Sequence, residues 1–167
     1  GIRMTAGHAV TVLNCTIVRN KAGATGGGVH VNSTWPAFSV LQNCIVYQNE
    51  AGCATSCTDD EISQVWVAGT NPGVAVTHCD IENFTTSGPF DTVTHLNNFG
   101  DDPLFVDPDG LNHAFGDGDD NYRLRPCSGC LDRADSSGLP SDEPNLDGDM
   151  VTDELLPDLG ILDRAVD

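Results

Sequence analysis

A short phrase occurs three times in this chain and constrains its fold more than any other feature. It spans residues 14–20, 43–49 and 78–83, and each copy has a polar residue, a cysteine, a β-branched residue two places later and an asparagine soon after. Aligning the three cysteines also aligns two columns of mainly apolar residues upstream. Internal repetition of this kind indicates a repeat architecture.

A further strand-like segment precedes each copy, so the repeat units cover residues 1–20, 28–49 and 64–83. Units of this length, made of two or three short alternating strands with no helical period, are typical of one turn of a parallel β-helix. The repeat stops after Asn83. The sequence therefore predicts an all-β fold with about three solenoid coils in residues 1–83, and an irregular C-terminal capping segment in residues 84–167.

The first coil is predicted to carry an open strand edge. Gly1 already lies inside a repeat unit, so we expect the chain to be the C-terminal part of a longer protein. The first coil of a solenoid needs cover from further coils or from another chain, and we predict such a stacking partner. The sequence contains neither a signal peptide nor an apolar run long enough to span a membrane.

The chain is strongly acidic, with 25 Asp and Glu residues against seven Lys and Arg, for a net charge of -18. Nucleic-acid binding requires a positive surface that displaces counterions, so this charge argues against it. The charge is compatible with bound divalent cations or with a secreted protein that is solvated by its carboxylates.

The seven cysteines divide into a repeated set and two local pairs. The repeated set shares one position of the coil and is predicted to stack as buried thiols, because a free cysteine behaves as a small hydrophobic residue. These residues are Cys15, Cys44 and Cys79. The local pairs have the spacing of short-range disulfides formed in an oxidising compartment, with a zinc site as the alternative. They are Cys53 with Cys57 and Cys127 with Cys130.

Strand alternation places one outward residue of each coil in a vertical stripe. Arg3, His30 and Trp66 occupy the same position of the first strand in the three coils, and neighbouring coils lie about 4.8 Å apart. We predict that they form a ligand-binding face, in which Trp66 stacks on a sugar ring while Arg3 and His30 form hydrogen bonds. The alternative is a solvated face with a partly covered tryptophan.

The residue before each repeated cysteine is predicted to lie at a tight corner between two strands. It is Asn14, Asn43 or His78. Asn tolerates the left-handed backbone conformation, and stacked Asn side chains form hydrogen bonds from coil to coil, so we expect a structural role. Loop 50–63 is longer and polar, which makes it a candidate contact surface.

Two acidic segments of the C-terminal part are candidates for binding Ca²⁺, because hard cations prefer several oxygen ligands in a flexible loop. The first holds Asp117, Asp119 and Asp120, and the second holds Asp147 and Asp149. The second segment loosely fits a calcium loop with Gly at its sixth position, although its first position is Glu and its second is Pro. Plain solvated turns are the alternative for both.

The C-terminal phrases, joined to the repeats, carry a resemblance to a known family. They lie at residues 102–107, 122–124, 128–132, 145–148 and 158–160. The chain resembles the C-terminal portion of bacterial right-handed parallel β-helix repeat proteins, which are secreted or surface-anchored and abundant in planctomycetes. The resemblance implies a right-handed coil and an extracellular or cell-surface location. The acidic insert 109–121, Cys127 and the segment 161–163 depart from the family pattern.

The resemblance implies a fold more directly than an activity, because functional sites are grafted on folds. A hydrolase of this fold needs two or three carboxylates from adjacent coils, whereas the coils here hold only Asp80 and Glu82, both in one coil. We therefore expect a structural or adhesive solenoid segment without a catalytic residue of its own, which binds a matrix or another chain. The alternatives are a polysaccharide lyase or glycoside hydrolase with its active coils upstream, and a carbohydrate-binding module.

Overall fold

The structure is a computed structural model of the 167-residue chain. It describes residues 1–5, 8–32, 38–52, 64–68, 73–85 and 94–137. Every element bounded within these ranges is a β-strand, which confirms the all-β prediction. The strands are β1 (Ile2–Thr5), β2 (Thr11–Leu13), β3 (Thr16–Val18), β4 (Val29–Asn32), β5 (Ser39–Gln42), β6 (Ile45–Tyr47), β7 (Val65–Val67), β8 (Val74–Thr77), β9 (Asp80–Ile81), β10 (Thr94–Leu96), β11 (Phe105–Asp107) and β12 (Asn121–Leu124).

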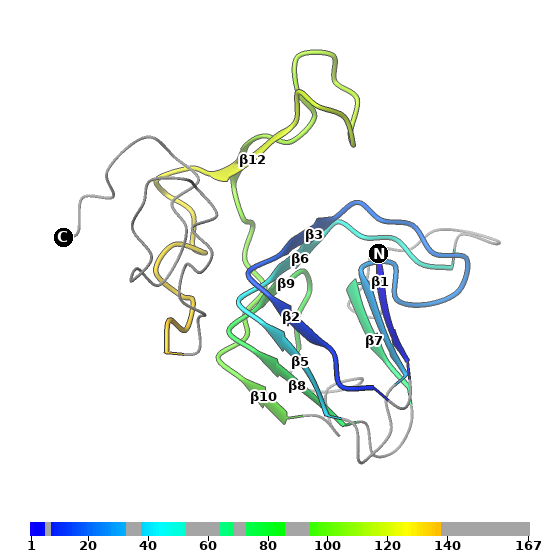
Figure 1. Ribbon diagram of the computed structural model, residues 1–167. Helices are drawn as coiled ribbons and strands as arrows, with labels where there is room; N and C mark the ends of the chain where they lie inside the picture. The colour runs from blue at the N-terminus through cyan, green and yellow to red at the C-terminus, as the bar shows by residue number, and fades with distance from the viewer. Residues whose placement is uncertain (6–7, 33–37, 53–63, 69–72, 86–93, 138–167) are drawn as a thin grey trace, which may run out of the picture. The chain divides into compact units, whose positions relative to one another are not determined.

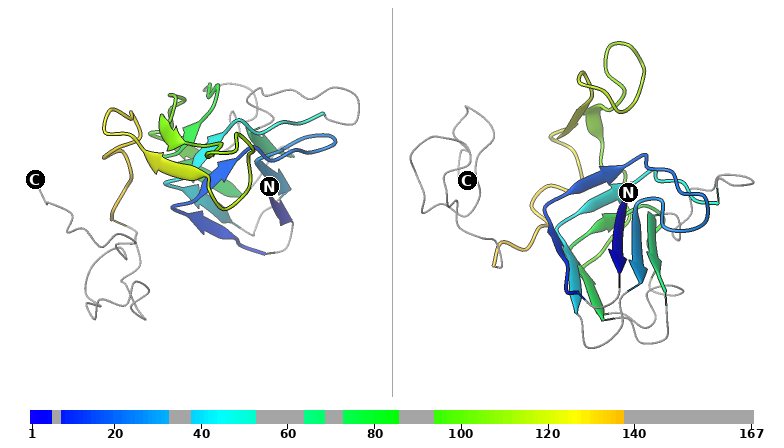
Figure 2. Two further views of the ribbon diagram at one scale, coloured as in Figure 1. Left: turned by 90° about the horizontal axis from the view of Figure 1, so that it is seen from above. Right: turned by 45° about the vertical axis from the view of Figure 1, so that its right-hand side comes forward.

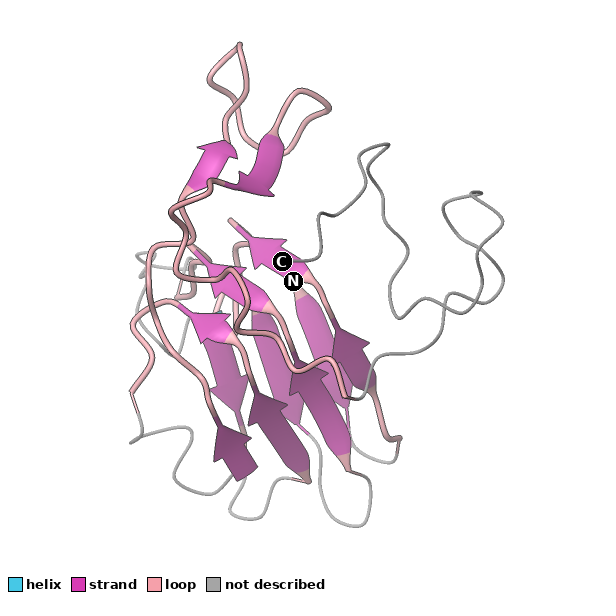
Figure 3. Ribbon diagram, turned by 90° about the vertical axis from the view of Figure 1, so that its left-hand side faces the viewer, coloured by secondary structure: helices cyan, strands magenta, loops and turns pink. Residues whose placement is uncertain are grey.

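The first ten strands form three parallel sheets that the chain visits in rotation. Their orders are β1-β4-β7, β10-β8-β5-β2 and β3-β6-β9. Each group of three consecutive strands makes one turn, and equivalent strands of successive turns lie side by side (Figures 1 and 3). This arrangement is a parallel β-solenoid of about three coils, as the repeat predicted.

The repeat columns coincide with the register of the sheets. Val12 pairs with Leu41 and Leu41 with Val76, and Ile17 pairs with Val46 and Val46 with Ile81. Because side chains alternate along a strand, these columns face the interior in every coil. The core consists of the inward aliphatic residues of all three sheets together with the cysteine column. Its members are Met4, Ile17, Val29, Val31, Leu41, Cys44, Val46, Val65, Val67, Val74, Val76, Cys79 and Ile81.

The corner before the cysteine column has the predicted left-handed backbone. Asn14, Asn43 and His78 have φ values of 53°, 55° and 52°. The Asn43 side-chain amide donates to Asn14 Oδ1 at 3.1 Å, so the corner residues of the first two coils are linked directly. Asn tolerates this conformation better than other residues with a side chain, which accounts for its place in the repeat.

A second ladder of polar side chains lies inside the next corner. The Asn49 amide is fully buried and donates to Ile17 O at 2.8 Å and to Gln64 Oε1 at 2.9 Å. Asn49 Oδ1 accepts a bond from the Asn20 backbone N–H at 2.9 Å. Buried polar groups that are fully paired in this way fix the register of the coils, because any shift leaves one of them without a partner.

The solenoid continues past the third repeat unit for part of a fourth turn. β10 pairs with β8, Phe99 forms a parallel bridge with Asp80, and Asn97 repeats the corner conformation with a φ of 56°. Asn98 stands at the cysteine position, where its Oδ1 accepts the Cys79 backbone N–H at 2.9 Å. The segment that we predicted as the start of the cap thus extends the coil pattern.

After this partial turn the chain leaves the parallel pattern. β11 and β12 pair with each other in antiparallel orientation, with a register shift between Phe105 and Asp107. The chain divides into two compact units, residues 1–134 and 135–167. Residues 138–167 of the second unit lie outside the described part of the chain.

Candidate functional site

The outward stripe on the first sheet forms in the predicted register. Arg3 pairs with His30 and His30 with Trp66, on β1, β4 and β7. Arg3 is exposed, whereas His30 and Trp66 are half-buried. His30 Nδ1 lies 3.3 Å from Thr25 Oγ1, which belongs to the connection that leads back into β4. The structure therefore brings the three residues together, while the binding of a ligand to them stays a prediction.

A groove of about 460 Å³ lies beside Arg3 and His30 of this stripe, and we call it the first-coil groove. Its lining includes Arg3 and His30 but not Trp66, together with residues of the connection 21–27. Lys21 also lines the groove and forms an ion pair with Glu50 at 2.9 Å. Figure 2 shows β1 at the outer edge of its sheet, with this connection beginning at the end of β3.

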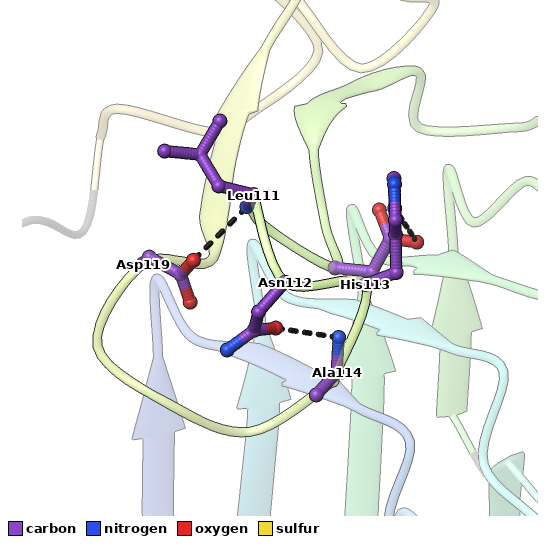
Figure 4. A network of polar contacts seen from close by, with 6 residues as sticks. Leu111, Asn112, His113, Ala114 and Asp119 are labelled. Atoms are coloured by element: carbon purple, nitrogen blue, oxygen red, sulfur yellow. Dashed lines mark hydrogen bonds and ion pairs between the residues drawn. The ribbon is translucent and has the colours of Figure 1, made fainter.

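The first predicted metal segment does bring its carboxylates together. One oxygen each from Asp117, Asp119 and Asp120 lies within 4.8 Å of the others. Figure 4 shows how the loop closes here, with Asp119 accepting the Leu111 backbone N–H at 2.9 Å. Exposed acidic groups often gather without an ion, so Ca²⁺ binding remains a prediction. Asp147 and Asp149 lie outside the described residues.

The pKa values of two carboxyl groups in this acidic loop are shifted by their contact with each other. The pKa of Asp117 is lowered, first by a hydrogen bond from the Asp119 side chain, and that of Asp119 is raised by the same contact. A cation bound between these two carboxylates would relieve the repulsion between them. Asp120 Oδ2 is engaged separately, accepting from the Tyr122 hydroxyl at 3.0 Å.

The repeated cysteines form the predicted column of interior thiols. Cys44 and Cys79 are buried, Cys15 is half-buried, and all three are free. Each Sγ donates to the backbone carbonyl two residues earlier, at 3.1 to 3.2 Å. The pKa of Cys79 lies well above its usual value, first because of its hydrogen bond with Cys44 and then because of burial. The same contact lowers the pKa of Cys44. Cys44 and Cys79 are members of the hydrophobic core and Cys15 packs against it, so the column contributes to the interior packing of the coils.

The predicted disulfide between Cys127 and Cys130 is absent, since both thiols are free. Cys130 Sγ instead donates to Asp80 Oδ2 at 2.9 Å. Burial, followed by this contact with the carboxylate, raises the pKa of Cys130 to about 12. The C-x-x-C spacing therefore misled the prediction, because one of its thiols serves as a hydrogen-bond donor to the third coil. Cys53 and Cys57 lie outside the described residues.

Asp80 is a buried acid that links the third coil to the segment after it. It is 1% exposed on the outer side of β9, and its Oδ1 accepts the Asp101 backbone N–H at 3.0 Å. Burial raises its pKa to about 6, although the Cys130 hydrogen bond acts in the opposite direction. The sequence indicates a special role for Asp80 in one respect: the equivalent residues of the other two coils, Thr16 and Ile45, are not acidic.

Glu82, the other acid of the coils, also has structural partners. Its Oε2 accepts the Gln48 backbone N–H at 2.7 Å and the Gln64 side-chain amide at 2.9 Å. Asp80 and Glu82 thus both bind neighbouring parts of the chain.

The interpretation of this chain's function rests on its fold and on the geometry of its candidate sites. No family model, no curated protein and no solved structure matches the chain. Among the described residues there is no helix with the length and apolar character needed to cross a membrane. The architecture defines the chain as a parallel β-solenoid, and its function is a matter for proposal.

Proposed function

We propose that this chain is a structural segment of an extracellular or cell-surface β-solenoid, and that it assembles through the open edge of its first coil. One observation carries the proposal: β1, β2 and β3 are edge strands of the three sheets, all at the same end of the stack. The resemblance to secreted right-handed β-helix repeat proteins supports the location.

The alternation of hydrogen bonds along parallel strands shows which groups this edge offers. Val10 O accepts the Val40 N–H, and the Asn14 N–H bonds to Gln42 O, so the even-numbered residues of this stretch bond to β5. In a parallel ladder the residues between them direct their N–H and C=O groups to the other side. Thr11 therefore presents its backbone away from the stack, which is where a further coil would pair.

Sedimentation velocity over a range of protein concentrations tests this proposal. We expect reversible association in the purified chain. Thr11→Pro removes an outward N–H without breaking a bond to β5, so it should weaken association at least tenfold while the circular dichroism spectrum is retained. Thr16→Pro makes the same change on β3, where Ile45 N bonds to Cys15 O and leaves Thr16 facing outward. A monomer at every concentration would refute self-assembly.

Carbohydrate binding is the second candidate, and the observation in its favour is the stripe on the first sheet. Arg3 pairs with His30 and His30 pairs with Trp66, so each of the three coils contributes one side chain to this row. A half-buried indole offers a flat face for a sugar ring, and its neighbours offer hydrogen bonds. Binding on a glycan array that is lost in Trp66→Ala would support this candidate; an unchanged binding profile would count against it.

A further inference from the structure

The first-coil groove is distinctive because of its charge. None of the described residues that line it is acidic, in a chain where acids outnumber bases by 25 to seven. Arg3 and Lys21 both line it, so it holds two of the seven Lys and Arg residues. Its volume of about 460 Å³ is also that of a site for a small molecule.

Of the two cationic side chains in the groove, Arg3 is the one without an acidic partner. Lys21 is paired with Glu50 at 2.9 Å, whereas Arg3 has no hydrogen bond or ion pair with any residue that the structure describes. A guanidinium presents a planar fork of N–H donors that matches the two oxygens of a carboxylate. The free charge and its geometry therefore favour an anion with a planar, two-oxygen head group.

The remaining walls are suited to the rest of such a ligand. Thr25 holds His30 through Nδ1, at 3.3 Å, and so leaves Nε2 of the ring for a second contact. Gly26 and Gly27 also line the groove, although both residues are buried. The net charge of -18 repels polyanions over long distances, so the groove selects a small ligand with few charges.

We propose that the first-coil groove binds a small organic carboxylate, with Arg3 clamping the carboxylate group and His30 and Lys21 contacting the rest of the molecule. Gly1, Ile2 and Arg3 line the groove, so it shares the first coil with the proposed assembly edge, whereas Thr11→Pro changes β2 and none of the residues that line the groove. The groove differs from the stripe proposed for carbohydrate, because Trp66 does not line it. Variants at Thr11 and Trp66 therefore separate the three proposals.

Amide chemical shifts of the intact chain, titrated with sodium succinate at low ionic strength, test the assignment. We expect saturable shifts at Gly26, Gly27 and His30, which succinamide, the uncharged analogue, does not produce. Arg3→Gln should weaken succinate binding at least tenfold, and added sodium chloride should weaken it further by screening. Lys21→Gln should have a smaller effect, because Glu50 already neutralises that lysine.

Arg123→Gln is the matched control, since Arg123 is also an exposed arginine on a strand and is remote in sequence from the groove. Its affinity for succinate should stay within twofold of the parent chain, as should that of Trp66→Ala. Unchanged succinate binding in Arg3→Gln, equal shifts with succinamide, or shifts confined to other residues would each overturn the proposal. Tighter binding of inorganic phosphate than of succinate would overturn the carboxylate assignment.

Discussion

The coils and the acidic loop of residues 109–120 are held together by different means. In the coils, the inward residues of three sheets pack into one core, and residues such as Leu41 and Val46 have no exposed surface. In the loop, exposed side chains bond to backbone groups nearby in the chain, as Asn112 does to Ala114 N at 2.7 Å, and Leu111 is 89% exposed. Repetition thus gives the coils a shared core, while the loop relies on local turns together with a contact to the first coil, in which the Arg19 guanidinium lies 3.3 Å from the centre of the Phe115 ring.

Truncation of a leucine in each region should give the largest contrast. Leu41→Ala removes a fully buried side chain from the middle coil, and it should lower the free energy of unfolding by about 2–5 kcal/mol. Leu111→Ala removes a side chain already in water and should change it by less than about 0.5 kcal/mol. Urea denaturation monitored by circular dichroism measures both. Similar losses for the two variants would mean that the loop packs against a core of its own.

The sequence predicted the coils well because their contacts recur at fixed columns. The cysteine, aliphatic and Asn columns all fall in the register of the sheets. The partial fourth turn was missed because Asn98 replaces the cysteine on which the alignment was built. The Asp80 contact with Cys130 was missed because it joins residues 50 apart, one of them in a segment without periodicity. No spacing rule identifies such a partner, and the same contact explains the failed disulfide prediction.

The two asparagine ladders provide the next contrast within the coils. Asn49→Ala leaves the Asn20 N–H without its acceptor, and we expect a loss of roughly 1–3 kcal/mol in unfolding free energy. Asn14→Gly removes only an exposed acceptor and keeps the positive φ, so its cost should be less than about 0.5 kcal/mol. Equal costs at the two positions would show that the buried ladder does not specify register.

Asp80 joins the coils to the segment beyond them, and its burial should make stability depend on pH. The pKa of Asp80 rises from 3.8 to about 6 on folding. Between these two pH values, the carboxyl group is protonated in the folded chain and ionised in the unfolded chain. The resulting stabilisation is complete below about pH 4 and is lost as the pH rises through 6. The groups that face Asp80 are Cys130, Asp101 and Arg133. Urea denaturation at pH 5 and pH 7.5 should show the larger unfolding free energy at pH 5.

General charge repulsion in an acidic chain gives a trend of the same sign, so a control is needed. Asp132→Asn removes one exposed charge from the same segment and should preserve the pH dependence, whereas Asp80→Asn should reduce it. Cys130→Ala removes a donor that stabilises the Asp80 carboxylate, and it should raise the pKa of Asp80 in a carboxyl NMR titration. A lower Asp80 pKa in that variant would contradict the role assigned to the thiol.

Calcium should have the smallest effect, because it acts on the exposed loop and not on the core. With one oxygen each from Asp117, Asp119 and Asp120, we expect a dissociation constant in the millimolar range, seen as amide shifts at Gly116 and Asp119 on addition of CaCl₂. Asp117→Asn should weaken binding severalfold, and Asp132→Asn should not. Since the contact with Asp117 raises the pKa of Asp119, affinity should fall as the pH is lowered. The unfolding midpoint of the coils should hardly move with Ca²⁺, because no residue of this loop belongs to the core of the coils. A large upward shift would show that the ion stabilises the coils as well as the loop.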